Sequence, residues 1–528
     1  MDMRTESIPI LIGVTGHREI READRLVLLD AVKRELEALK ARCPHSQLLM
    51  MNSLAAGADQ LCAEAADALG IPLIAVLPLP KEDYEADFDG AALTAFRESY
   101  DRAEQAFVAP AVEAEPQEPS RDFAYRQAGI YIASHAQVLL ALWDGKAGGD
   151  CGTAAIVDCF LHGAYQPVYG APLLNTGIVI HVQTPRGDST ETAGEVRTLG
   201  DREAWEELIR RTEEFNALAA SAPITVSPLL PKDREPDEAL DRAETLYAAA
   251  DALSVRHAAL YRRILALIAV FSTIITLTFL VYDEGELHWM ILLYGISFLI
   301  AWGILRYARK TACHERYINY RALAEGLRVQ AFLRYAGCKA EAGALLPWSQ
   351  QEGSPWVAST IRASSVGDAP KTRNEIRLCW VEAQRDYHAA AAKKAEKKQA
   401  RSERIVRIAW IVSFVLYFIA LIVELLAGTF FPMRPLITHA AEIRTAMKFV
   451  WGGIAAATLF IGSYYGHLSL SRGVEDHRKM AKFYARLDDR LKRYGQTEEA
   501  LVLLAREELI ENSNWCAYQQ DNAPELNI

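Results

Sequence analysis

A GVTGHR segment at residues 13–18 has the composition of a phosphate-binding loop. It follows an apolar run typical of a strand and precedes a helical pattern, so an anion bound there would lie at a helix N-terminus. Glycines let the backbone approach the anion, and two basic residues can donate charge-assisted hydrogen bonds to it. A tight turn with basic surface residues would give the same pattern. The candidate ligand-binding residues are Gly13, Thr15, Gly16, His17 and Arg18.

A second strand-to-helix loop, NSLAAGAD at residues 52–59, consists of small residues that permit close approach of a ribose or a phosphate. Its candidate ligand-binding residues are Ser53, Gly57 and Asp59. The carboxylate of Asp59 can accept hydrogen bonds from ribose hydroxyls, or it can serve only as the N-cap of the following helix.

The third loop, LWDGKAGGDCGT at residues 142–153, ends an apolar strand and opens a helix with a glycine-rich turn. Thr153 can cap this helix or bind a phosphate oxygen, although the order of residues is not that of a Walker A motif. Three such loops at strand ends of one sheet converge in space, so together they predict a ligand site. The candidates here are Asp144, Gly148, Gly149, Gly152 and Thr153.

The elements that must position these loops alternate between short apolar strands and longer amphipathic helices. This alternation is typical of an α/β domain with a Rossmann-like, largely parallel sheet. Helices are expected at Leu26–Leu39 and Gln60–Leu69, and surface loops at Pro110–Pro119 and Pro185–Gly200. Strands are expected at Ile8–Val14, Gln47–Asn52, Leu73–Val76, Val138–Leu142 and Ile178–Val182.

The chain of 528 residues, 51% hydrophobic and 24% charged, is long enough for two or three folded units. Its 57 Lys and Arg against 68 Asp and Glu give a net charge of −11, so no direct nucleic-acid binding is expected. Eight cysteines without a CxxC pair argue against a disulfide framework and against a zinc site. The N-terminus lacks the pattern of a secretory signal, so the first domain is expected in the cytosol.

Four apolar runs after position 260 are each close to the ~20 residues that span a bilayer. The connection at 283–288 has no Lys or Arg, whereas basic residues flank the other ends of the first three runs. The positive-inside rule therefore places both termini and the middle segment in the cytoplasm, and three basic residues in the 429–448 loop weaken this signal without reversing it. The runs are Ile264–Tyr282, Trp289–Leu305, Ile408–Leu426 and Phe449–Tyr465.

The region after residue 237 is thus expected to be all-α, with four transmembrane helices in two similar hairpins and long cytosolic helices. The expected domains are 1–230 for the sheet, 237–340 and 374–528 for the two hairpins, and a linker at 341–373. An Ala/Lys-rich helix at 389–404 would lie just inside the membrane, as a solvated flank or in contact with anionic lipid.

Three residues within the apolar runs are candidates for lining a pore: Thr276, Ser463 and Glu424. A hydroxyl in a membrane helix more often bonds to the carbonyl groups of its own helix. The carboxylate can face a pore or a partner, or it can lie near the outer interface.

The order of motifs resembles that of the SLOG superfamily of Rossmann-like domains over roughly residues 8–185. This superfamily includes the LOG nucleotide phosphoribohydrolases, the DprA-type domain and, more distantly, the N-terminal domains of TRPM channels. The membrane half resembles SLATT domains, two-helix membrane modules of predicted bacterial conflict systems, through HERYINYRALAEGLRVQAFLRYAG and WVEAQRDYHAAAAKKA. The first resemblance rests on GVTGHR, SLAAGADQLCAEAA, PLIAVLPLPKEDYEADF and YRQAGIYIASHAQVLLALWDGKAGGDCGT.

The resemblance implies a nucleotide or NAD-derived ligand. LOG enzymes carry a PGGxGTxxE segment whose glutamate serves hydrolysis, but here Gly152-Thr153 is followed by Ala-Ala-Ile and by no carboxylate before Asp158. No catalytic residue is assigned, because cleavage of a glycosidic bond needs a general acid or base within reach.

The expected function is that of a multi-pass sensor-effector of the bacterial inner membrane that acts in antiviral defence. Its cytosolic sheet domain would bind a nucleotide-derived signal, and its membrane helices would form or gate a pore as a homo-oligomer in the lipid bilayer. One alternative is a membrane-tethered nucleotide phosphoribohydrolase whose acid is Asp144, Asp150 or Asp158. The other is a passive scaffold.

Overall fold

The computed structural model describes residues 7–172, 176–187, 189–222, 224, 228–231, 233–284, 287–370, 372–427, 442–456, 458 and 470–521. The chain forms two compact units, each assembled from segments that are separate in sequence. The sheet unit comprises Met1–Leu253, Asn319–Ile376 and Gln496–Cys516. The helical unit comprises Ser254–Ile318, Arg377–Gly495 and Ala517–Ile528.

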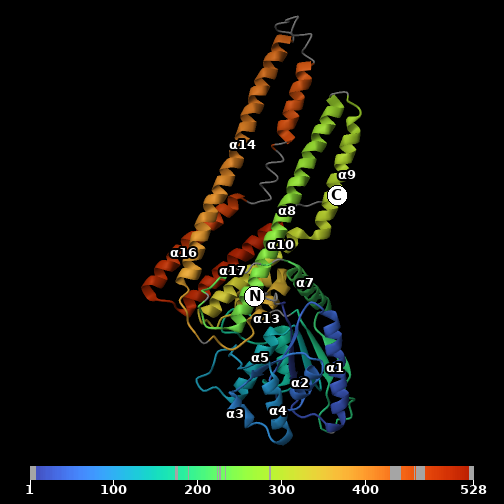
Figure 1. Ribbon diagram of the computed structural model, residues 1–528, viewed down its shortest axis with the longest axis vertical. Coiled ribbons are helices and arrows are strands. Elements are labelled where there is room, and N and C mark those ends of the chain that lie inside the picture. Colours follow the sequence, from blue (N-terminus) through green and yellow to red (C-terminus); the bar gives the residue numbers. More distant parts are fainter. Residues whose placement is uncertain are drawn as a thin grey trace. The chain divides into compact units, whose positions relative to one another are not determined.

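A seven-stranded sheet in the order β4-β3-β2-β1-β5-β6-β7 forms the centre of the sheet unit (Figure 1). Neighbouring strands are parallel except at one edge, where β6 and β7 are antiparallel. This confirms the predicted Rossmann-like, largely parallel sheet. The strands are β1 Ile10–Gly16, β2 Leu48–Asn52, β3 Leu73–Leu77, β4 Gln105–Val108, β5 Val138–Trp143, β6 Ile178–Gln183 and β7 Val196–Leu199.

The five strands expected from the sequence all form, because each is an apolar run buried on both faces of the sheet. Two edge strands were not expected. In β4 only Phe107 is buried, and β7 has no buried residue, so neither strand has the continuous apolar run of a central strand. The expectation of a surface loop over all of Pro185–Gly200 was therefore wrong for its last part, which contains β7.

Helices cover both faces of the sheet (Figure 1). On one face, α5 and α6 pack against strand residues in a single apolar cluster that joins Ile130, Phe160, Leu139 and Val179. The helices expected at Leu26–Leu39 and Gln60–Leu69 form as α1 and α2, which pack against each other. The helical segments before residue 230 are η1 Glu22–Asp24, α1 Arg25–Arg42, α2 Ala58–Ala68, α3 Lys81–Glu85, α4 Gly90–Arg102, α5 Arg121–His135, α6 Thr153–His162 and α7 Arg202–Ser221.

The sheet unit also recruits segments from far along the chain. The stretch expected as a linker at 341–373 contains three helices, α11 Ala342–Leu345, α12 Trp348–Gly353 and α13 Pro355–Ser365. All residues of α13 after Pro355 are buried, and α13 packs against α5 and α7. The stretch expected as a linker is therefore part of the sheet unit, because α13 buries the apolar groups of its whole circumference there.

The remaining helices belong partly or wholly to the helical unit. They are α8 Glu238–Glu284, α9 Met290–Thr311, α10 Cys313–Tyr335, η2 Arg377–Glu382, α14 Ala383–Ala427, α16 Leu470–Tyr494 and α17 Glu498–Asp521. Residues 442–456 are helical as well. Within the helical unit, α14 packs against α16, and Ile264 and Leu265 of α8 form an apolar cluster with Cys313.

Three helical segments of the described chain are long and apolar enough to cross a membrane, within Glu238–Asp283, Met290–Tyr335 and Arg377–Ile422. Apolar side chains such as Trp410, Phe414 and Phe418 are exposed on α14, as expected of a lipid-facing surface. The fourth expected span, Phe449–Tyr465, extends beyond the described residues, so four crossings remain a prediction.

Candidate functional site

The three candidate loops meet at the carboxyl edge of the sheet, where the strand order reverses between β1 and β5. Gly16 at the end of β1 is in register with Leu142 of β5. The backbone N–H of His17 donates to the carbonyl of Leu142 at 3.0 Å, and the N–H of Ala58 donates to the carbonyl of His17 at 3.0 Å. In open α/β sheets this switch point is where ligands bind.

Two glycines permit this close approach. Gly57 has φ of 83°, and a Cβ there would lie 2.4 Å from the carbonyl oxygen of Arg18. A Cβ on Gly16 would lie 2.3 Å from the Cβ of Ala58. Any larger residue at either position would push the first two loops apart. Gly13 has a different role, since its missing side chain leaves room for Ile132 of α5.

A cavity of about 510 Å³ opens at this edge. It is bordered by the start of α6, whose N-cap Gly152 has no side chain to cap the helix. The first N–H groups of α6 are thus left for water or a ligand, and the helix dipole favours an anion there. The lining residues are Thr15, Gly16, His17, Arg18, Glu19, Asp122, Tyr125, Cys151, Gly152, Thr153 and Arg186.

Two arginines supply positive charge to the cavity. The guanidinium of Arg18 stacks over the ring of Tyr125 at 4.6 Å. Arg186 was not predicted as a site residue; it follows β6 at the same carboxyl edge as the other loops. Its place after an expected strand was the available signal, but the surrounding Pro- and Gly-containing sequence indicated only a surface loop.

His17 is buried and positions its neighbours. Its Nε2 accepts a hydrogen bond from the backbone N–H of Asp144 at 3.0 Å, and Arg186 Nε donates to it at 2.9 Å. Burial and the charge of Arg186 lower the pKa of His17, against the opposing effect of Asp144. A neutral imidazole that accepts hydrogen bonds differs from the phosphate donor expected from the sequence. Arg18, Arg186 and backbone N–H groups are therefore the donors that an anion in this cavity would contact.

Asp144 anchors the turn after β5. Burial favours its neutral form, but the N–H of Lys146 and the positive charge of Arg186 lower its pKa. Its carboxylate accepts from the N–H of Lys146 at 3.2 Å and lies 3.4 Å from His17 Nε2. Asp144 thus stays ionised and holds His17 and Arg186 in place.

Asp59 is buried in the first turn of α2, behind the first two loops. Burial raises its pKa to about 7, against the opposing effects of the Ala55 N–H, Arg18 and the Ser53 N–H. The N-cap of α2 is Gly57, so Asp59 does not have the N-cap role considered for it. The described residues that line the cavity include neither Asp59 nor Ser53.

The remaining candidate residues lie outside the lining of this cavity. Gly148 and Gly149 lie in the exposed part of the third loop, where a Cβ would meet open space. Of the acids considered for a hydrolase, Asp144, Asp150 and Asp158, none is among the described residues that line the cavity. Asp158 instead pairs with His162 at 2.7 Å on α6.

Of the three membrane candidates, Thr276 is the one whose side chain the structure describes. The Thr276 hydroxyl donates to the carbonyl of Ser272 at 2.9 Å, the bond within a helix that competes with a pore-lining role. The side chain of Glu424 and the whole of Ser463 lie outside the described residues.

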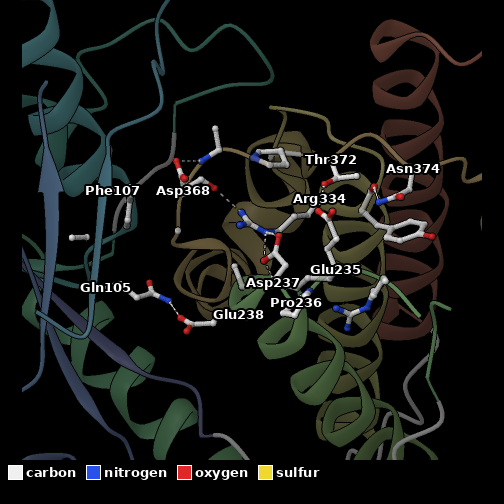
Figure 2. Close-up of a pocket in the computed structure, with 18 of the residues that line it drawn as sticks. Gln105, Phe107, Glu235, Pro236, Asp237, Glu238, Arg334, Asp368, Thr372 and Asn374 are labelled. Carbon is white, nitrogen blue, oxygen red and sulfur yellow. Dashed lines mark hydrogen bonds and ion pairs between the residues drawn. The ribbon is translucent and has the colours of Figure 1, made fainter. Parts of the chain in front are cut away.

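Another cavity of the sheet unit, of about 410 Å³, lies between β4 and the start of α8 (Figure 2). Its charged groups are largely paired with each other: Arg334 Nε donates to both carboxylate oxygens of Asp237 at 2.7 Å, and Nη1 donates to the carbonyl of Asp368 at 3.1 Å. Asp237 also caps α8 by accepting from the N–H of Leu240. We interpret this region as a structural junction that holds α8 and α10 together.

No family model matches the chain, and no curated protein matches it.

Asp59→Asn should make the protein more stable at pH 8 than the parent chain, with a smaller gain at pH 5. A carboxyl whose folded pKa is about 7 takes up a proton on folding between about pH 4 and pH 7, so stability falls as pH rises through this window. The asparagine removes that loss, which is of the order of 1.4 kcal/mol for each unit of pKa shift. Thermal unfolding of the detergent-purified chain at the two pH values measures the difference.

Asp67→Asn, at an exposed position on the same helix, is the matched control and should show no such trend. An Asp59→Asn variant that is destabilised equally at both pH values would contradict the raised pKa.

Proposed function

We propose that this protein is a membrane-anchored sensor whose sheet unit binds a nucleotide-derived ligand at the β1/β5 edge. The observation that carries the proposal is the convergence of the glycine-rich loops, the uncapped start of α6 and two arginines around one cavity. Backbone N–H groups at a helix N-terminus together with arginines are suited to a phosphate group. The ring of Tyr125 beside Arg18 adds a surface on which a base can stack.

The resemblance of the loop order to SLOG domains supports the same ligand class, and that of the membrane half to SLATT domains supports a role at the membrane. We propose that ligand binding drives the four expected membrane helices of several chains to form or open a pore in the bacterial inner membrane. This can occur only if the ligand binds the assembled or open state more tightly than the other state.

Titration of the full chain in detergent with AMP, ADP-ribose and NAD⁺ tests the ligand class. At least one of these compounds should bind saturably, with inorganic phosphate as a weaker competitor because it lacks the base and ribose. If neither the nucleotides nor phosphate bind, the sheet unit is not a nucleotide sensor. Release of free base during the same incubation would favour the hydrolase alternative.

The proposed topology predicts which segments react with reagents outside the cell. In a Cys151→Ser background, which removes an exposed thiol, a cysteine introduced at Leu287 should react with a membrane-impermeant maleimide in spheroplasts. A cysteine at Lys393, in the basic cytosolic stretch, should react only after the membrane is permeabilised. Labelling of Lys393→Cys from outside would invert the proposed orientation.

A further inference from the structure

A third cavity of the sheet unit, of about 520 Å³, is lined by the C-terminal half of α5, the loop at 110–115, residues 165–169 and the segment at 339–344. It is distinct from the β1/β5 cavity, because the lining residues of the two do not overlap. Both cavities border the same helix: Asp122 and Tyr125 of α5 line the first, and Ser134 and His135 line this one.

One wall of this cavity contains an arginine with unsatisfied donors. Arg362 of α13 is 3% exposed, and its Nη1 donates to the Ser134 carbonyl and the Tyr165 hydroxyl at 3.4 Å each. Its Nε and Nη2 have no hydrogen-bond partner among the groups that the structure describes. These two nitrogens form one edge of the guanidinium, the edge that binds both oxygens of a carboxylate or phosphate. Unpaired donors of a buried guanidinium are costly, so this edge favours an oxyanion.

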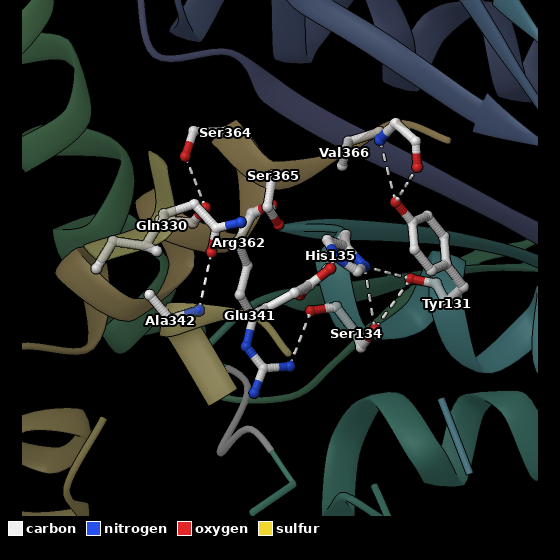
Figure 3. A network of polar contacts seen from close by, with 12 residues as sticks. Tyr131, Ser134, His135, Gln330, Glu341, Ala342, Arg362, Ser364, Ser365 and Val366 are labelled. Carbon is white, nitrogen blue, oxygen red and sulfur yellow. Dashed lines mark hydrogen bonds and ion pairs between the residues drawn. The ribbon is translucent and has the colours of Figure 1, made fainter. Parts of the chain in front are cut away.

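His135 and Glu341 lie beside Arg362 (Figure 3). His135 Nε2 lies 3.1 Å from both oxygens of Glu341, and its Nδ1 lies 2.8 Å from the Tyr131 carbonyl. The Ser134 hydroxyl also lies 3.1 Å from His135 Nδ1. Burial opposes ionisation of Glu341, but His135 and Arg362 lower its pKa, so it remains a carboxylate. Arg362 and Glu341 therefore carry opposite charges.

The other charged groups of the wall are paired or balanced in sign. Glu113 is held by Arg126, whose Nε and Nη2 donate to its two oxygens at 2.9 and 3.2 Å. The other charged lining residues balance each other in sign, two acids against two bases: Glu115, Glu498, Lys339 and Arg373.

The rest of the wall is apolar or aromatic, with Pro110, Val112, Pro167 and Val168 among its residues. A ligand that fits both the guanidinium edge of Arg362 and the apolar wall has one oxyanion and a small apolar body. We propose that this cavity is a second binding site, for a small organic anion that carries a carboxylate or phosphate on an aromatic or aliphatic body, held by Arg362.

Benzoate and phenyl phosphate are probes of this class, and benzyl alcohol is a neutral control of the same size. Saturation-transfer NMR of the full chain in detergent should detect saturable binding of at least one acid below about 10 mM, a range suited to ligands of so few atoms. Which acid binds more tightly identifies the preferred head group. Benzyl alcohol should bind at least about tenfold more weakly, because it cannot satisfy the guanidinium.

Two variants test the residues. Arg362→Gln removes the charge and should weaken the acid by at least about tenfold. Val168→Trp fills the cavity from a half-exposed position and should have the same effect while keeping the parent melting temperature, so it decides the result if Arg362→Gln does not fold. A Gly152→Asp variant, altered in the β1/β5 cavity, should bind the acid normally even if nucleotide binding is lost.

Three results would overturn the proposal: no saturable binding of either acid to the parent chain, equal binding of benzyl alcohol, or unchanged affinity in either folded variant. Each result is independent of whether nucleotides bind at the β1/β5 edge.

Discussion

Gly152→Asp should lower nucleotide affinity by at least about 100-fold while leaving the sheet unit folded. Gly152 is the N-cap of α6 and has φ of −82° and ψ of 170°, a backbone conformation in which aspartate is a favoured N-cap. The new carboxylate would take the N–H groups proposed for the phosphate. Two like charges about 4 Å apart repel by about 4 kcal/mol at an effective dielectric constant of about 20, enough for such a loss.

Gly152→Asn is the matched control because asparagine caps a helix equally well but carries no charge. We expect it to weaken nucleotides far less than the aspartate does, since it competes for the N–H groups without repelling phosphate. A Cβ at this position lies 3.1 Å from the Gly149 carbonyl oxygen in both variants, so any strain there is shared. Titration of both variants with the same nucleotide gives the comparison. Equal affinities in the two would mean that no phosphate lies at the start of α6.

The second large effect concerns the membrane. The nucleotide that binds most tightly among AMP, ADP-ribose and NAD⁺ should convert a smaller detergent-solubilised species into a larger one and raise dye leakage from liposomes by about tenfold or more. The four expected spans of one chain would be too few to enclose a wide pore, so the proposed pore requires an oligomer. Light scattering after size-exclusion chromatography measures the first quantity and calcein release measures the second.

Gly152→Asp should show neither response, and Gly152→Asn should show both at higher nucleotide concentration. If a nucleotide that binds saturably changes neither the oligomer nor the leakage, the protein is a binding module without pore activity. A larger oligomer without leakage would mean that the ligand drives assembly alone.

The sequence determined the centre of the fold. The strands β1, β2, β3, β5 and β6 are continuous apolar runs because both faces of a central parallel strand are buried. The glycines of the first two loops were visible as well, although the contacts that require Gly16 and Gly57 are made with residues at the ends of neighbouring strands. The helical period of Leu26–Leu39 and the length of the apolar runs likewise depend on local sequence alone.

The tertiary structure decided which groups meet. Arg186 is adjacent to His17 only because β6 lies next to β5. The separation of these two residues along the chain does not indicate that strand pairing. The neutral state of His17 follows from its burial beside that arginine, which a motif cannot reveal. Arg362 joins Ser134 and Tyr165 only because α13 packs against α5, although more than 190 residues separate it from either. Local sequence sets which elements form, whereas burial and charge at a site depend on contacts made after distant segments pack.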